Sequence, residues 1–237
     1  MNCQHILERY AFFFRRYPVT SFDRWVDTAL KPWVVMLYVI GLVISFVYID
    51  RWIAYYFHDH PVNALWPILY RLTDLGLGAV YLIPLFLLAL FFRYVSPQRL
   101  WERRAWFLWG SVLVPSLICL VLKILLGRAR PELLFSEHLY GFYGFHRHAS
   151  FWSFPSGHTT AVMGFVFGVS ALFPRYAYAV LIYGLLVALS RVLLTQHFVS
   201  DVMIASGLAL VEVGLMYRWI QSLDKRAGRQ ALGCDVG

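Results

Sequence analysis

Long apolar runs separated by short polar segments make up most of the chain. A helix needs about 20 apolar residues to cross the hydrocarbon core of a bilayer, and most of the runs approach that length. The fourth and fifth runs are among the shortest, which is typical of helices buried among neighbouring helices. The pattern predicts an all-α fold, a polytopic membrane bundle of six transmembrane helices. The six runs are residues 33–49, 75–92, 105–126, 157–173, 177–193 and 202–219.

The chain before the first run is basic and aromatic instead of uniformly apolar. Residues 21–27 read S-F-D-R-W-V-D, which places a serine at a helix N-cap position ahead of mixed apolar and charged positions. This pattern predicts an amphipathic helix on the membrane surface, with an unstructured tail as the alternative. We expect a cytoplasmic, interfacial segment over residues 1–31, a membrane domain over 32–220 and a cytoplasmic tail over 221–237.

Composition excludes an ordinary soluble domain. Hydrophobic residues make up 60% of the 237 residues and the mean hydropathy is +0.61, whereas soluble domains are roughly 45–50% apolar. The net charge of +8 does not indicate nucleic-acid binding, because of how the basic residues are distributed. Cys3, Cys119 and Cys234 are scattered and suggest no disulfide or zinc framework. The sequence predicts no metal or other cofactor, and it defines no oligomeric state.

Lys and Arg are divided unequally between the two sets of loops. Placing the N-terminus in the cytoplasm groups residues 1–31, 93–104, 174–176 and those after 217 on one side, with 14 of the 21 basic residues. Because positive charge is enriched on the cytoplasmic side, we expect both termini in the cytoplasm of a bacterial-type inner membrane. The other seven basic residues lie toward the outside: Arg51, Arg71, Lys123, Arg128, Arg130, Arg147 and Arg191.

The stretch S-R-V-L-L-T-Q-H-F-V-S-D, residues 190–201, ends one apolar run and begins the next. Ionisable residues inside membrane proteins are costly and usually mark a function. If the turn around Ser200 is helical, His197 and Asp201 share a face, so the carboxylate can accept one ring N–H and leave the other nitrogen as a nucleophile. Arg191 adds a forked cation suited to phosphate. A helix-terminal histidine beside an unrelated acid is the alternative.

Pro155-Ser156-Gly157-His158 directly precedes the fourth run. Ser156 suits an N-cap, and Gly157 lets a ligand approach the backbone. The free N–H groups at a helix start favour anions, and His158 in the first turn is placed to protonate a leaving oxygen. An ordinary helix start with an interfacial histidine is the alternative.

The third run ends with Lys123 and is followed by Arg130-Pro131. Alone, Lys123 could be a snorkelling lysine and Arg130 a loop charge. However, the short link 174–176 makes the fourth and fifth runs antiparallel neighbours. A helix from Ser156 to Phe173 is roughly 27 Å long and one from Ala177 to Arg191 is roughly 22 Å long, so the chain returns to nearly the same depth, beside residues 155–158. All three polar stretches therefore open on one membrane face, which favours a single phosphate site.

Together these stretches resemble the three-part signature of the type 2 phosphatidic acid phosphatase (PAP2) superfamily, in its integral-membrane lipid phosphatase branch. The resemblance covers residues 123–201, and all eleven signature positions match in order. The six-run layout is unlike the soluble haloperoxidases of the family, which hold vanadate. The matching residues are Lys123, Arg130, Pro131, Pro155, Ser156, Gly157, His158, Ser190, Arg191, His197 and Asp201.

The resemblance implies a helical bundle with a metal-independent phosphatase site. His197 would attack phosphorus and form a phosphohistidine, with Asp201 orienting the imidazole. His158 would protonate the leaving group and then activate water. The residues that would hold the phosphoryl oxygens are Lys123, Arg130, Ser156, Gly157 and Arg191.

The sequence thus favours a lipid phosphate or diphosphate phosphatase acting at the outer face of the inner membrane. Undecaprenyl diphosphate, phosphatidylglycerol phosphate, phosphatidic acid and lipid A phosphate are all candidate substrates. A lipid phosphotransferase would use the same phosphohistidine, whereas a lipid transporter or scramblase would use the basic cleft only to bind head groups. Arg128 either adds charge to the site or anchors the interface. The aromatic loop 133–152 predicts either a lid over the lipid tail or a membrane anchor.

Overall fold

The computed structural model describes residues 21–231, and every regular element in this range is a helix. Five helical stretches are long and apolar enough to cross a membrane, so the chain is a multi-pass membrane protein. These stretches are Pro32–Asp59, Asn63–Val95, Arg99–Leu126, Pro174–Leu193 and Val199–Asp224.

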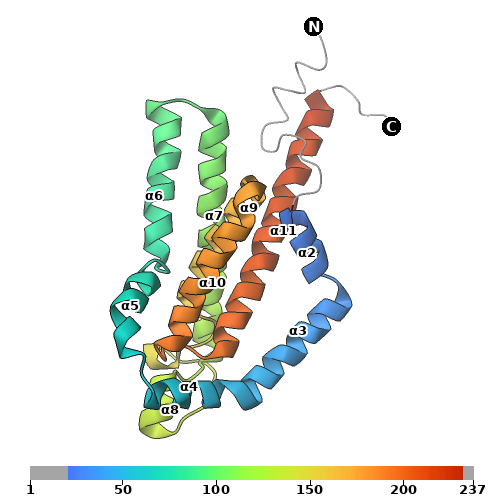
Figure 1. The fold of residues 1–237 in the computed structure, drawn as a ribbon. Coiled ribbons are helices and arrows are strands. Elements are labelled where there is room, and N and C mark those ends of the chain that lie inside the picture. The colour runs from blue at the N-terminus through green and yellow to red at the C-terminus, as the bar shows by residue number, and fades with distance from the viewer. Residues whose placement is uncertain (1–20, 232–237) are drawn as a thin grey trace.

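The first stretch is one continuous helical path that bends. It consists of α3 (Pro32–Ile44), a π-helical turn η1 (Ser45–Ile49) and α4 (Asp50–Asp59). The π turn places the Ser45 hydroxyl against Asp50, to which it donates a 3.0 Å hydrogen bond. In Figure 1, α4 crosses the lower end of the bundle, beneath α10 and α11. The helix therefore continues beyond the predicted apolar run and brings Asp50 to that end.

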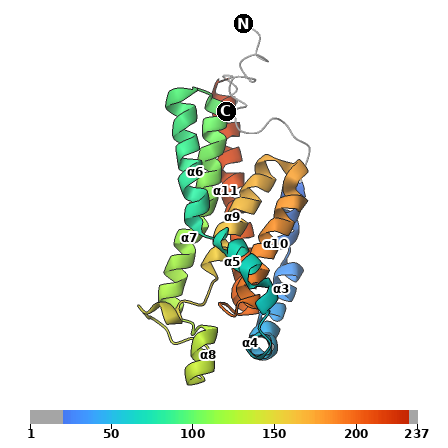
Figure 2. The ribbon, with the colours of Figure 1, turned by 60° about the vertical axis from the view of Figure 1, so that its left-hand side comes forward.

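The second and third stretches form an antiparallel pair. A 3-10 turn η2 (Asn63–Leu65) and α5 (Trp66–Asp74) lead into α6 (Gly78–Leu90) and a π-helical end η3 (Phe91–Val95), and α7 (Arg99–Leu126) returns beside α6. The break between α5 and α6 is a corner at which α5 packs on α10 (Figure 2).

A loop region with α8 (Pro131–Glu137) and the 3-10 turn η4 (Ala149–Phe151) joins α7 to α9 (Gly157–Leu172). The 3-10 turn η5 (Pro174–Tyr176) then leads to α10 (Ala177–Leu193), which runs back along α9. The last helix is α11 (Val199–Ala231). The predicted antiparallel neighbours are confirmed, whereas α11 continues beyond residue 220, where we expected the membrane domain to end.

The sixth predicted span corresponds to α9, which differs from the other five. Its 16 residues are fewer than the about 20 required to cross a bilayer, so the count of six spans stays a prediction. Twelve of these residues are buried, because α9 packs against α7, α10 and α11. The expectation of a run enclosed by its neighbours is confirmed for α9 but wrong for the fifth run, because α10 leaves Ile182, Leu185 and Leu189 exposed.

Small residues allow α7 and α9 to approach closely. A Cβ added to Gly164 would lie 2.3 Å from the backbone oxygen of Ser111, and one added to Gly168 would lie 2.3 Å from the Ser111 hydroxyl. Small residues at such a contact let helix backbones pack tightly where no hydrophobic force drives association. This packing fixes the position of α9, whose first turn carries His158.

The segment predicted to be amphipathic is helical: α2 spans Ser21–Ala29. Phe22 and Val26 are buried, and Phe22 makes an edge contact with Tyr217 of α11 at 5.5 Å. The apolar side of α2 therefore packs on the bundle. Its position on the membrane surface stays a prediction, and residues 1–20 lie outside the described part of the chain.

The two ends of the bundle differ in the segments they carry. The α6–α7 turn and the end of α11 lie at the upper end in Figure 1, whereas α4, α8 and the lower ends of α7, α10 and α11 lie at the other. Figure 2 shows the same division from a second direction. The three polar stretches of the sequence gather at the lower end.

Candidate active site

The end of α7 supplies the first site residue, Lys123. Its side chain is buried, and Nζ donates a 2.6 Å hydrogen bond to the carbonyl of Trp152. Gly127 ends the helix in the left-handed region with φ of 51°, where glycine is favoured. A Cβ at Gly127 would lie 1.9 Å from the carbonyl oxygen of Gly144. The chain therefore turns sharply at Gly127, after Lys123, and the backbone at Gly144 packs directly against this turn.

Arg130 stands at the N-cap of α8 and is half-buried. Its backbone N–H donates to the carbonyl of Ser150 at 2.9 Å. Within the described residues, its buried Nε has no hydrogen-bond partner. The backbone of Arg130 is thus held in place, while Nε of its guanidinium remains available to a ligand.

The start of α9 lies against α11 and α7. The N–H of Ser156 donates to the backbone carbonyl of Asp201 at 3.2 Å. A Cβ at Gly157 would lie 3.5 Å from Cε of Lys123. Ser156 occupies the predicted N-cap position but its hydroxyl makes no capping bond, because it accepts a 3.1 Å hydrogen bond from the Thr159 hydroxyl instead. The three motifs meet here, as predicted from the return of the chain.

His158 is half-buried in the first turn of α9. Opposite it lies Gly76, in the corner between α5 and α6. A Cβ on Gly76 would lie 2.8 Å from Cβ of His158, a distance that real Cβ atoms do not adopt. The absence of a side chain at Gly76 therefore makes the space in which the imidazole sits.

Arg191 is buried near the end of α10. Its Nη1 donates a 2.6 Å hydrogen bond to the Thr73 hydroxyl, so the corner after α5 also positions this cation. The carbonyl of Arg191 accepts hydrogen bonds from the N–H groups of Gln196 and His197, at 3.0 and 3.2 Å. The side chain of Arg191 thus binds α5, while its backbone carbonyl holds the loop that carries His197.

His197 is paired with Asp201, although not in the way predicted. Helix α11 begins at Val199, so His197 precedes it and the two residues do not share a helical face. Instead the carboxylate points back over the helix start, where Oδ2 accepts the N–H of Phe198 at 2.9 Å. Nδ1 of His197 lies 3.6 Å from the same oxygen, which is beyond hydrogen-bond length, and within the described residues it has no closer partner.

The environment of His197 favours its neutral form. Burial, helped by the charges of Lys123 and Arg191, lowers the pKa of His197 to about 3, although Asp201 opposes this shift. The imidazole therefore carries a lone pair at neutral pH, as a nucleophile requires.

Asp201 is bound on its other side by Arg128. Nη1 of Arg128 donates a 2.5 Å hydrogen bond to Oδ1 of Asp201, while the Ser153 hydroxyl donates to Oδ2 at 2.6 Å. Nη2 of Arg128 forms a 2.7 Å ion pair with Oδ2 of Asp50. Burial lowers the pKa of Arg128, but the carboxylates of Asp201 and Asp50 outweigh this effect and hold it above its usual value. Arg128 therefore belongs to the site as a support for Asp201.

The remaining cations have no such partners. Within residues 21–231, Lys123, Arg130 and Arg191 form no ion pair with a carboxylate. Uncompensated charge in a largely buried place is costly, so this arrangement suits an anionic ligand. Guanidinium groups in particular match the geometry of phosphate oxygens.

Sequence reasoning missed three supporting residues. Asp50, Thr73 and Gly76 come from α4 and the α5–α6 corner, far along the chain from the three motifs. The one signal available was that Asp50 is an acid at the end of an apolar run. Of the loop aromatics, Phe142 stacks on Phe46 at 5.7 Å and its ring centre lies 5.5 Å from the Arg128 guanidinium. The roles of the loop as a lid or a membrane anchor both stay predictions.

Comparison with known proteins identifies the family. The model of the PAP2 superfamily matches residues 104–225, just over half of the chain. The chain belongs to the PAP2 superfamily. The matched segment contains the three signature stretches but excludes Asp50, Thr73 and Gly76.

Curated relatives of this PAP2 protein include two proteins named lipid A 1-phosphatase. The one from Rhizobium etli is 38% identical over 103 residues, which cover 44% of each chain. The one from Rhizobium johnstonii is 37% identical over 103 residues, which cover 44% of this chain and 41% of the relative. The match thus spans less than half the length of either relative. A solved transmembrane PAP2-type phosphatidylglycerolphosphate phosphatase from Bacillus subtilis is 15% identical with a TM-score of 0.42, covering 85% of this chain and 92% of its own.

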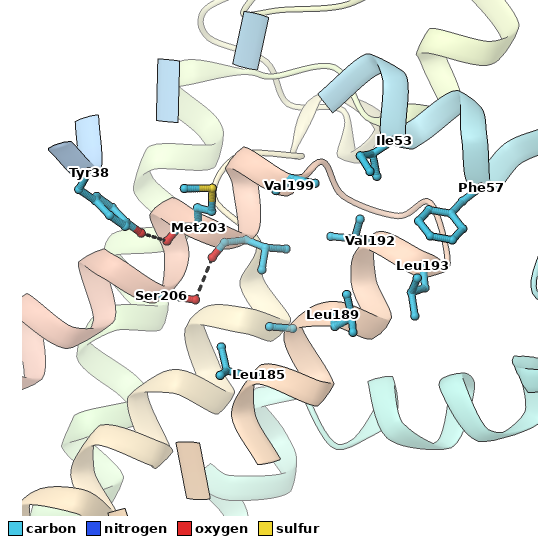
Figure 3. Close-up of a pocket in the computed structure, with 12 residues that line it drawn as sticks. Tyr38, Ile53, Phe57, Leu185, Leu189, Val192, Leu193, Val199, Met203 and Ser206 are labelled. Atoms are coloured by element: carbon cyan, nitrogen blue, oxygen red, sulfur yellow. Dashed lines mark hydrogen bonds between the residues drawn. The ribbon is translucent and has the colours of Figure 1, made fainter. Parts of the chain in front are cut away.

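A separate apolar pocket of about 550 Å³ lies between the α3–α4 path and helices α10 and α11 (Figure 3). None of the candidate site residues lines it. The hydroxyl of Tyr38 donates to the carbonyl of Met203 at 2.5 Å, and that of Ser206 donates to the carbonyl of Val202 at 2.9 Å. Both hydroxyls are therefore already satisfied, and the pocket offers apolar contacts but no chemistry.

Proposed function

We propose that this PAP2 protein is a membrane lipid phosphatase whose nucleophile is His197. The observation that carries the proposal is the position of His197, whose Nδ1 lies 3.6 Å from Oδ2 of Asp201 and which is set among three cations without carboxylate partners in the described residues. A phosphoryl group would neutralise those cations and place its phosphorus before the imidazole. Phosphoryl transfer depends mainly on such positioning and charge stabilisation.

In the first step, Nε2 of His197 attacks phosphorus and the bond from phosphorus to the lipid oxygen breaks. His158 gives its proton to that oxygen, so the lipid leaves as an alcohol, or as a monophosphate from a diphosphate. In the second step, water gives a proton to His158 and its oxygen attacks phosphorus, breaking the P–N bond. Inorganic phosphate leaves and both histidines return to their starting states.

Charge stabilisation comes from the residues around the phosphoryl oxygens. Lys123, Arg130 and Arg191 would neutralise the anion, and the start of α9 would donate to it through the Ser156 hydroxyl and the backbone N–H groups from Gly157 onward. This set can stabilise the developing charge without a metal ion, so we propose a metal-independent reaction.

A 1-phosphate on a lipid A-type glycolipid is the proposed substrate, because two curated relatives carry the name lipid A 1-phosphatase. The phosphate of such a lipid lies at the membrane boundary, at the depth where the ends of α7, α10 and α11 meet. The positive-inside distribution of Lys and Arg supports an inner-membrane protein whose site faces the periplasm, with both termini in the cytoplasm.

The test is phosphate release by purified protein from a panel of lipids in one detergent. The panel contains lipid A 1-phosphate, undecaprenyl diphosphate, phosphatidylglycerol phosphate and phosphatidic acid. We expect the highest kcat/KM for lipid A 1-phosphate and no release by the His197→Ala variant. Release of phosphate from none of the four would refute the phosphatase, and turnover that requires a second acceptor lipid would identify a phosphotransferase.

A further inference from the structure

Asp50 is buried in contact with the site although it lies outside the segment that the family model matches. It stands at the start of α4, the helix that crosses the end of the bundle (Figure 1). Its exposed fraction is 1%, and that of Arg128 is 0%. Two fully buried charges need partners of opposite charge, and the ion pair between Asp50 and Arg128 partly neutralises both.

The contacts of Asp50 reach the helix that carries Asp201. Oδ1 of Asp50 accepts the backbone N–H of Ser200 at 2.9 Å, and Oδ2 accepts the Ser200 hydroxyl and Nη2 of Arg128. Ser200 lies in the first turn of α11, where N–H groups have no partner within the helix. Asp50 thus fixes the beginning of α11 directly and through Arg128.

Arg128 divides its fork between two carboxylates. Nη2 binds Asp50, while Nη1 binds Oδ1 of Asp201. With Oδ1 held, the Asp201 carboxylate cannot rotate freely, so Oδ2 stays directed toward His197. Because Arg128 is also paired with Asp50, it neutralises Asp201 less completely. The Asp201 carboxylate therefore attracts the imidazole N–H more strongly.

Five aromatic rings enclose the Arg128 guanidinium. Its central carbon lies 4.6 Å from the ring centre of Phe198 and 4.9 Å from that of Phe46. Such rings attract a cation and exclude water, so the ion pairs to both carboxylates are little screened. The other three rings are those of Tyr140, Phe142 and Phe154.

From these contacts we infer that Asp50 and Arg128 are positioning residues of the phosphatase reaction, acting on His197 through Asp201. The inference rests on the proposed function and adds α4 to the catalytic machinery. The carboxylate of Asp50 and the terminal nitrogens of Arg128 are taken up by Ser200, Asp201 and each other, so we assign neither a contact with the phosphate. Their loss should therefore slow the chemical step without weakening the binding of the phosphoryl group.

The decisive experiment measures kcat per competent site, counted by the burst of phosphohistidine, together with KM and the inhibition constant of vanadate. The variants are Asp50→Asn, Arg128→Gln and Arg128→Lys, with Asp59→Asn as the matched control on the same helix. Asp59 is exposed at the other end of α4. We expect kcat to fall about 10- to 100-fold in the first two variants, the loss found when the partners that orient metal-binding residues are removed. KM and vanadate inhibition should change less than threefold, and Asp59→Asn should match the parent.

Arg128→Lys separates positioning from charge balance. A lysine keeps the charge but lacks the two-pronged fork, so we expect it to recover less than a tenth of the parental kcat. If the array only supports the fold, thermal unfolding and yield will suffer while kcat per competent site stays parental in every variant, and the inference is wrong. The pair Asp50→Asn/Arg128→Gln removes one negative and one positive charge, so the net charge of the buried cluster is unchanged, and Asp201 keeps the Ser153 hydroxyl and the Phe198 N–H as donors. This double variant should fold and still be slow. Failure of the parent to form phosphohistidine would instead refute the proposed function.

Discussion

Nη1 of Arg191 donates a 2.6 Å hydrogen bond to the hydroxyl of Thr73, joining the end of α10 to the corner between α5 and α6. The same corner holds Gly76, against which His158 packs. The proposed phosphate-binding cation and the proposed general acid therefore depend on one short segment, to which we assign no catalytic group. Variants of this segment therefore test the site while leaving His158, Arg191 and His197 in place.

Replacing Thr73 by valine should remove the hydrogen bond that positions Arg191, while valine keeps the shape of the threonine side chain. A hydrogen bond to a charged group contributes about 1.5–3 kcal/mol, so kcat/KM should fall about 10- to 100-fold, mainly through KM. Steady-state kinetics on the preferred lipid measures this. Thr73→Ser keeps the hydroxyl and should retain most activity; equal losses in both variants would show that the hydroxyl is not what matters.

Gly76→Ala should displace His158. The added Cβ would lie 2.8 Å from Cβ of His158, and overpacking of this kind costs about 1–3 kcal/mol. We expect kcat to fall about tenfold or more, because the general acid moves from its position. Gly78→Ala provides the control, since its added Cβ meets only ordinary contacts at 3.8 Å or more. Parental kcat in the Gly76 variant would contradict the assigned position of His158.

His197→Ala should abolish turnover, with a loss of at least about 10³-fold, because no other group forms the phosphohistidine. Asp201→Asn should be less severe, since the nucleophile survives with a wrongly oriented or less basic ring. Rapid quenching with radiolabelled substrate and peptide mapping locates the trapped phosphate. Phosphate found on any residue other than His197 would overturn the assignment.

Excess chelator should leave turnover unchanged, whereas vanadate should inhibit in competition with substrate. The reason is that Lys123, Arg130 and Arg191 supply the positive charge that a metal would otherwise provide, and a trigonal-bipyramidal oxyanion matches the transition state. The measurement is phosphate release with and without each reagent. Complete loss in chelator with recovery on adding a divalent ion would rule out the metal-independent reaction.

Topology can be checked with reporters that are active on only one side of the membrane. A reporter fused after Gly237 should be active in the cytoplasm, and a tag near Glu137 should be accessible from outside. This follows from the excess of Lys and Arg in the loops assigned to the cytoplasm. The opposite pattern would place the site on the cytoplasmic face and exclude a periplasmic substrate.

The local parts of the site could be predicted from the sequence. A short link between two runs of known length returns the chain to its starting depth, so residues 190–201 had to come back beside 155–158. The hydrogen bond from the Ser156 N–H to the Asp201 carbonyl shows that they do. Such reasoning works because helix rise per residue is fixed.

The supporting residues could not be predicted, because they depend on how distant helices pack. The polar residues after Ile49 ended the apolar run, but a helix needs only its own backbone hydrogen bonds and continues through Asp59. The crossing of α4 over the bundle, which buries Asp50, is set by tertiary contacts. Similarly, nothing near Thr73 or Gly76 in the sequence indicates that this corner lies against α9 and α10.

The buried position of Asp50 determines the order in which the helices can be fixed during synthesis. Asp50 leaves the ribosome before its partners, since Arg128 lies 78 residues later and Ser200 lies 150 residues later. While α3 and α4 are the only helices in the membrane, an unpaired carboxylate at that depth is costly and favours the water boundary. Only the arrival of α11 gives it both partners. The first of the five candidate spans to be made is thus the last to be secured, and a chain truncated before α11 would leave this acid without its two hydrogen bonds from Ser200.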